Sequence, residues 1–108
     1  QADDAPLIPQ LLDTLRYMLS RSSKLAVALT AGNLVPCLLA MLEPAAPISR
    51  VKLLEIIRYL YEQCPRNKEV LQAQVEPVAL TLFGSQGPGA EAVHQEARRL
   101  LAAFQSGN

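Results

Sequence analysis

The sequence predicts an all-α fold, and three observations support this prediction. Half of the 108 residues are apolar, which is enough for a buried core in a chain of this size. Leu and Ala, both strong helix formers, dominate the composition, whereas Trp is absent and β-branched residues are sparse. Nearly every segment spaces its apolar residues at the helical period, and strand-like alternation is absent.

Three helices are predicted in the first part of the chain, over 7–21, 24–31 and 34–42. The first carries an apolar stripe at i, i+3, i+4 and i+7. Gly32 is a natural stop for the second helix, and Asn33 is a natural N-cap for the third.

Four further helices are predicted, over 48–63, 67–74, 76–83 and 90–105. Pro65 ends the first of these, and Pro77 is placed in the first turn of a short helix of its own. The order is therefore long, short, short, long, short, short, long, or about seven helices.

Residues 1–108 are expected to form a single helical domain with a frayed segment at 1–5 and a flexible loop at 84–89. The chain opens without an initiator Met, so we expect it to be a piece of a longer protein. Its two cysteines are too few for a disulfide scaffold and favour a reduced, cytoplasmic setting.

The two long predicted helices share an internal repeat. Residues 11–17 read Leu-Leu-Asp-Thr-Leu-Arg-Tyr and residues 53–59 read Leu-Leu-Glu-Ile-Ile-Arg-Tyr, with four of seven positions identical. Pro36 and Pro77 correspond at almost the same offset along the chain. A period of about 42 residues with three helices per unit is the armadillo spacing.

The stretch 29–39, Leu-Thr-Ala-Gly-Asn-Leu-Val-Pro-Cys-Leu-Leu, resembles the junction between the first two helices of an armadillo repeat. The corresponding Gln74-Val75-Glu76-Pro77 lacks the glycine, so its turn must differ. The resemblance implies an armadillo-like or HEAT-like helical repeat stack.

A second resemblance lies in Leu53-Leu54-Glu55-Ile56-Ile57 together with the run 61–68, Tyr-Glu-Gln-Cys-Pro-Arg-Asn-Lys. These residues resemble the C-terminal non-kinase region of the MAP kinase kinase kinase epsilon family and its fungal septation-initiation and mitotic-exit relatives. The match covers roughly 24–72, and Cys64 and Asn67 depart from the family pattern. It implies a regulatory segment of a cytoplasmic kinase, at the spindle pole or cytoskeleton, with a small GTPase or scaffold as partner.

Enzymatic chemistry is not expected. The single histidine, His94, is predicted to be solvated, and no nucleophile elbow, phosphate loop or kinase catalytic motif is present. The cysteines lack a C-x-x-C spacing, so neither a metal site nor a cofactor is predicted. A formal net charge of zero argues against nucleic acid, and the absence of a long apolar run argues against a membrane span.

The candidate site is instead a partner-binding groove on the long helices. Aligning their shared Arg-Tyr motif pairs acid with acid, Arg with Arg and Tyr with Tyr, and tyrosine and arginine are good interface anchors. The acid and the tyrosine of each helix are i, i+4 neighbours and share one face. The predicted groove residues are Asp13, Arg16, Tyr17, Glu55, Arg58, Tyr59 and, on the last helix, Arg99.

Alternatives to this groove remain. The tyrosines could instead belong to the core, and the arginines could be surface residues with buried stems. A stack of little more than two repeats is expected to expose apolar faces at both ends, since no polar capping helix is evident. The chain could therefore be a purely structural terminal segment of a longer solenoid, or a homo-oligomerisation module that forms a homodimer.

Overall fold

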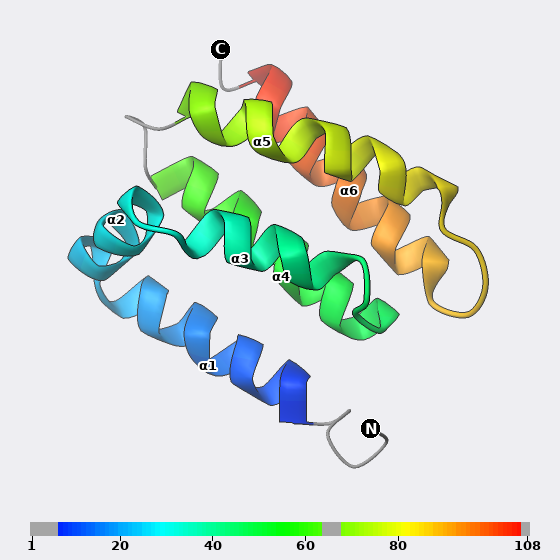
Figure 1. The fold of residues 1–108 in the computed structure, drawn as a ribbon, viewed down its shortest axis with the longest axis horizontal. Helices are drawn as coiled ribbons and strands as arrows, with labels where there is room; N and C mark the ends of the chain where they lie inside the picture. Colours follow the sequence, from blue (N-terminus) through cyan, green and yellow to red (C-terminus); the bar gives the residue numbers. More distant parts are fainter. Residues whose placement is uncertain (1–6, 64–67, 107–108) are drawn as a thin grey trace.

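The computed structural model describes residues 7–63 and 68–106, and all of its regular elements are helical (Figure 1). The elements are α1 (Leu7–Arg21), α2 (Ser23–Ala31), α3 (Leu34–Leu42), α4 (Pro47–Gln63), α5 (Lys68–Thr81), the 3₁₀ turn η3 (Leu82–Gly84) and α6 (Ala90–Ser106). The segment 1–5, predicted to fray, lies outside the described residues, as does Cys64.

The predicted bounds of most helices are confirmed to within one residue, and local signals explain them. The hydroxyl of Ser22 caps α2 by accepting the Leu25 amide, and the Gly32 amide donates to the Ala28 and Leu29 carbonyls to close its last turn. Asn33 precedes α3 as predicted, although its side chain makes no capping hydrogen bond to the backbone.

The prediction of two short helices over 67–74 and 76–83 is wrong, because α5 is one helix with Pro77 inside it. The described residues therefore form six α-helices, not seven. An internal proline removes one backbone hydrogen bond at a cost of about 3 kcal/mol. Pro77 lies on the exposed side of α5, and the carbonyl that it frees belongs to exposed Ala73, where water can satisfy it.

The helices are arranged in two sets (Figure 1). The long helices α1, α4 and α6 run in one direction, with α4 between the other two, while α3 and α5 run the opposite way in front of α4 and α6. α2 links α1 to α3 and packs on α1 and α4. The Cα radius of gyration, 13.3 Å, matches the value of about 13 Å expected for a compact globule of this length.

The core is centred on α4, which is buried on several sides. Seven of its 17 residues are buried. Tyr61, at its C-terminal end, meets Phe104 of α6 edge to face with ring centroids 4.8 Å apart. α4 thus holds α1 on one side and α6 on the other.

The two ends of the arrangement expose apolar side chains to different extents. On α1, Leu7, Leu11, Tyr17 and Met18 are exposed. On the described part of α6, no large hydrophobic side chain is exposed. α5, which packs on α6 at that end, exposes Val70 and Leu80, so apolar side chains are exposed at both ends and α1 carries more of them.

Arg50 ties the end of α3 to the loop before α6. Its Nε donates to the Leu42 carbonyl at 2.8 Å, one Nη donates to the Glu43 carbonyl, and the other to the Ser85 hydroxyl at 3.3 Å. The cation thus satisfies backbone carbonyls at the negative end of the α3 dipole.

We expect Arg50→Ala to lower the free energy of unfolding by about 2 kcal/mol, because charged hydrogen bonds to carbonyls are lost. Arg50→Lys should recover less than half of that loss, since an ammonium cannot present the planar fork. Urea unfolding followed by circular dichroism measures both variants. Equal stabilities of Arg50→Ala and the parent chain would contradict this role.

Candidate functional site

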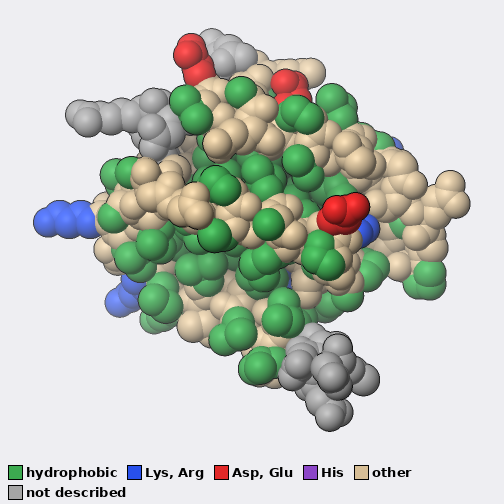
Figure 2. All heavy atoms as spheres, in the orientation of Figure 1, with side chains coloured by type: hydrophobic (Ala, Val, Ile, Leu, Met, Phe, Trp, Pro, Cys, Tyr) green, Lys and Arg blue, Asp and Glu red, His purple; other side chains and the backbone are tan. Residues whose placement is uncertain are grey.

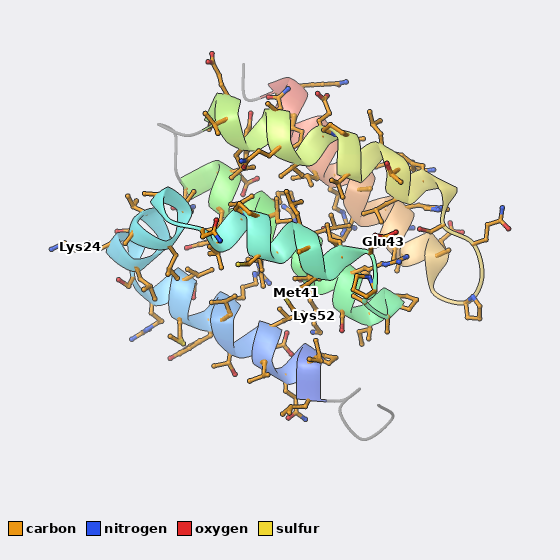
Figure 3. The ribbon with its side chains drawn as sticks, in the orientation of Figure 1. Lys24, Met41, Glu43 and Lys52 are labelled. Carbon is orange, nitrogen blue, oxygen red and sulfur yellow. The ribbon has the colours of Figure 1, made fainter. Side chains whose placement is uncertain are left out.

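Ion pairs between α1 and α4 form the first part of the predicted groove. Lys52 Nζ lies 2.7 Å from Asp13 Oδ1, and Arg16 Nη1 lies 3.7 Å from Glu55 Oε1. Lys52 projects from α4 on the side that faces α1 (Figure 3). Each pair thus joins residues that are one helical turn out of step with the predicted alignment of Asp13 with Glu55.

The two predicted tyrosines lie at one hollow between these helices. The hollow has a volume of about 310 Å³ and is lined by Asp13, Arg16, Tyr17, Ser20 and Tyr59. We call these five residues the α1–α4 hollow. Four of the seven predicted groove residues are therefore brought together, and Glu55 joins them through its ion pair with Arg16.

The tyrosines differ in their surroundings. Tyr59 is partly buried against the core, and its hydroxyl donates to the Leu19 carbonyl at 3.4 Å. Tyr17 is 63% exposed, and the Arg21 guanidinium carbon lies 5.8 Å from its ring centroid. The alternative in which the tyrosines belong to the core therefore holds in part for Tyr59 and not for Tyr17, whose ring is exposed to solvent.

The remaining predicted residues, Arg58 and Arg99, meet at Glu96 of α6 instead of lining the hollow. Arg99 Nη1 is 2.5 Å from Glu96 Oε2, and Arg58 Nη2 is 3.7 Å from Glu96 Oε1. Arg58 also lies 4.0 Å from Glu62, one turn along α4. The Glu96 side chain is only 3% exposed. The predicted row from Tyr17 to Arg99 is thus two separate clusters.

Four residues of these clusters were not predicted: Ser20, Lys52, Glu62 and Glu96. Glu96 carried a sequence signal, because it lies within the apolar stripe of Val93, Ala97 and Leu100 at the spacing of a buried position. A charged residue there predicts a buried partner. Ser20, Lys52 and Glu62 carry no such signal, since all three are ordinary surface types.

A larger hollow of about 590 Å³ lies between α3, α4 and α5. Its lining includes apolar side chains from α3, α5 and η3, together with Glu43, Arg50, Thr81 and Ser85. The guanidinium of Arg50 is already engaged with two carbonyls and the Ser85 hydroxyl. The hollow therefore presents a mainly apolar wall and a cation held by the protein itself.

Metal-binding clusters are not found among the described residues. In the described part of the chain, no three His, Cys, Asp or Glu side chains are grouped to hold a metal ion. His94, expected to be solvated, is half-buried; its Nε2 lies 3.1 Å from the Ser85 carbonyl oxygen, and its ring lies beside Phe83. This histidine serves the packing of the loop.

Within residues 7–63 and 68–106, no single helix is long and apolar enough to cross a membrane. α2 and α3 have the length and composition of a membrane span only when they are taken together, and the chain bends by 77° between them.

No protein-family model matches the chain, and neither a curated protein nor a solved structure matches it.

Proposed function

We propose that this chain is a non-catalytic protein-binding module on an armadillo-like or HEAT-like helical stack, with the α1–α4 hollow as its binding site. The observation that carries the proposal is Tyr17, whose ring is exposed at a hollow edged by an arginine and an acid. Tyrosine offers a large, rigid contact area at low entropic cost, and arginine can bind a carboxylate or a carbonyl of the partner.

The arrangement of the helices supports the repeat-stack part of the proposal. α1, α4 and α6 begin at Leu7, Pro47 and Ala90, at nearly even intervals along the chain, and they run in the same direction. Between α1 and α4 the chain forms two short helices, α2 and α3, whereas between α4 and α6 it forms the single helix α5. The unit of α5 and α6 is therefore closer to a HEAT-like helical pair.

The cellular setting is proposed on the resemblance alone. If the chain is the non-kinase region of a cytoplasmic signalling kinase, a small GTPase or a scaffold of the spindle pole or cytoskeleton is the class of partner to test. The competing proposal is a purely structural segment of a solenoid. It is favoured by the ion pairs of Asp13, Arg16 and Glu55, which already satisfy one another.

The test is a selection of displayed peptides on the immobilised chain, followed by calorimetric titration of the selected peptides. We expect Tyr17→Ala to weaken binding at least tenfold, because it removes the exposed anchor, while thermal unfolding stays unchanged. Val70→Ala is the matched control, since Val70 of α5 is 62% exposed, close to the 63% of Tyr17. Peptides that bind both variants as tightly as the parent chain would refute this site and favour the structural role.

A further inference from the structure

α1 carries more apolar surface than its packing buries. It contacts α2 and α4, and these contacts bury Leu12 and Leu19. Leu7, Leu11 and Met18, which follow one another at i, i+4 and i+11 on one side of the helix, remain exposed. This side lies away from Asp13 and Arg16, so it is distinct from the α1–α4 hollow.

The other long helices show what normally covers such a side. α3 packs on α4 and α5 packs on α6, in both cases antiparallel to the long helix (Figure 1). Among the described residues, α1 has no antiparallel helix in front of it. Met41 of α3, also exposed, lies on the side of α3 that faces α1 (Figure 3).

Together Leu7, Leu11, Met18 and Met41 form what we call the α1 face. Figure 2 shows hydrophobic side chains gathered over the α1 and α3 part of this view, with the charged side chains mainly towards its margins. Exposed apolar side chains that gather on two helices in this way are typical of an interface.

A second copy of the chain, joined through the same face, offers this face more exposed apolar side chains than a continuation of the stack does. A head-to-tail neighbour would offer α6, whose exposed described side chains include no large hydrophobic one, together with α5, on which Val70 and Leu80 are exposed. A two-fold axis across α1 instead places the same apolar stripe on both sides of the contact.

The charge and direction of α1 also suit a two-fold contact. Two copies of α1 related by such an axis run antiparallel, as α3 does on α4 and α5 on α6. Arg21 follows Met18 at the end of the stripe of Leu7, Leu11 and Met18. In the antiparallel pair, the two Arg21 side chains therefore lie at opposite ends of the contact. A parallel pair would bring the two Arg21 side chains together.

We propose that the chain forms a symmetric dimer in which α1 packs antiparallel against α1 of a second copy, with Leu7 opposite Met18 of the partner subunit. α1 has 15 residues and is about 22 Å long, so the contact is smaller than the roughly 800 Å² per partner of a standard interface. The dimer is therefore of the small, weak class of interface, and its formation should depend on concentration.

Sedimentation velocity of the full chain over a wide concentration range tests the contact. The parent mass should rise towards twice the 11.8 kDa of one chain as the concentration increases. Leu11→Glu and Met18→Glu should each weaken dimerisation by more than 30-fold at unchanged helicity, because each buries a charge against the partner's stripe.

Leu80→Glu is the control, because Leu80 of α5 has the same residue type and the same 55% exposure as Leu11. It should leave dimerisation intact. A mass that stays at one chain at every concentration would overturn the proposal and assign the α1 face to a different partner. Loss of the dimer with Leu80→Glu alone would overturn it as well.

Disulfide cross-linking tests the direction of the pair, with Cys37 and Cys64 first replaced by Ser. In the proposed register the two copies of Thr14 lie near the two-fold axis, whereas the two copies of Arg21 are about 25 Å apart along the helix direction. Thr14→Cys should therefore cross-link on mild oxidation, and Arg21→Cys should not. Efficient cross-linking of Arg21→Cys, or of neither variant while the chain is dimeric, would refute the antiparallel contact.

Discussion

Gly89→Ala is expected to lower the free energy of unfolding by about 3 kcal/mol, the sum of a backbone penalty and a steric clash. Gly89 has a φ of +84°, a backbone conformation that costs an L-residue about 1–2 kcal/mol. In addition, a Cβ at this position would lie 2.7 Å from Cβ and 3.2 Å from Cγ of Pro47, at the first residue of α4. The proline ring is rigid, so the start of α6 would have to move away from α4.

Gly87 provides a control in the same loop. Its φ is +98°, but a Cβ there meets nothing within 4 Å. Gly87→Ala should therefore cost only the conformational penalty, about 1 kcal/mol. Chemical denaturation of both variants measures the difference. Equal losses would show that the contact with Pro47 does not hold α6 in place.

The loop containing these glycines illustrates what the sequence could and could not predict. Its Gly and Pro content predicts a connection between helices, and the structure has one. The contact between Gly89 and Pro47 joins positions far apart in the sequence, and neither residue type indicates the other. The bounds of most helices were accessible because caps and stops such as Ser22 and Gly32 act locally.

α5 shows where a local rule failed. Pro77 was expected to begin a new helix, as Pro36 does near the start of α3. Gly32, which ends α2 before Pro36, corresponds by the internal repeat to Gln74, and glutamine does not stop a helix. The buried residues Leu71, Val75 and Ala79 lie one turn apart and continue across the expected break. The absence of a glycine at position 74 therefore indicates the unbroken helix α5 better than the presence of Pro77 indicates a break.

The sequence predicted which helices carry the candidate site, but it did not predict which charged side chains form ion pairs there. The internal repeat placed Tyr17 and Tyr59 on neighbouring helices, and both line one hollow. Which charges meet depends on the stagger between helices, about one turn, and that stagger is set by core packing. The binding role of these residues stays a prediction.

Glu96→Ala is expected to lower the free energy of unfolding by about 2 kcal/mol, because a buried carboxylate is lost from between two arginines. The carboxylate lies 2.5 Å from Arg99 and 3.7 Å from Arg58. Without it, Arg58 keeps a buried Nε that has no hydrogen-bond partner and loses its nearer acid. Removing one partner of a fully buried pair costs about 3–5 kcal/mol, and solvent at the two arginines reduces that figure here.

Glu62 is the matched control, because it is the other acid beside Arg58 but is half exposed and 4.0 Å away. Glu62→Ala should change the free energy of unfolding by less than about 0.5 kcal/mol. In a double-mutant cycle, Arg58→Ala and Glu96→Ala together should cost about 1–2 kcal/mol less than the sum of the single changes. Strict additivity would show that the two side chains do not stabilise each other.

Glu96→Ala also tests whether the Arg58–Glu96–Arg99 cluster takes part in binding together with the α1–α4 hollow. Glu96 joins α4 to α6, whereas the α1–α4 hollow depends on Asp13, Arg16 and the tyrosines. At temperatures where Glu96→Ala is folded, a peptide whose binding depends on Tyr17 should bind it as tightly as the parent chain. If that affinity falls as much as with Tyr17→Ala, the Arg58–Glu96–Arg99 cluster contacts the partner, and the site extends across all three long helices.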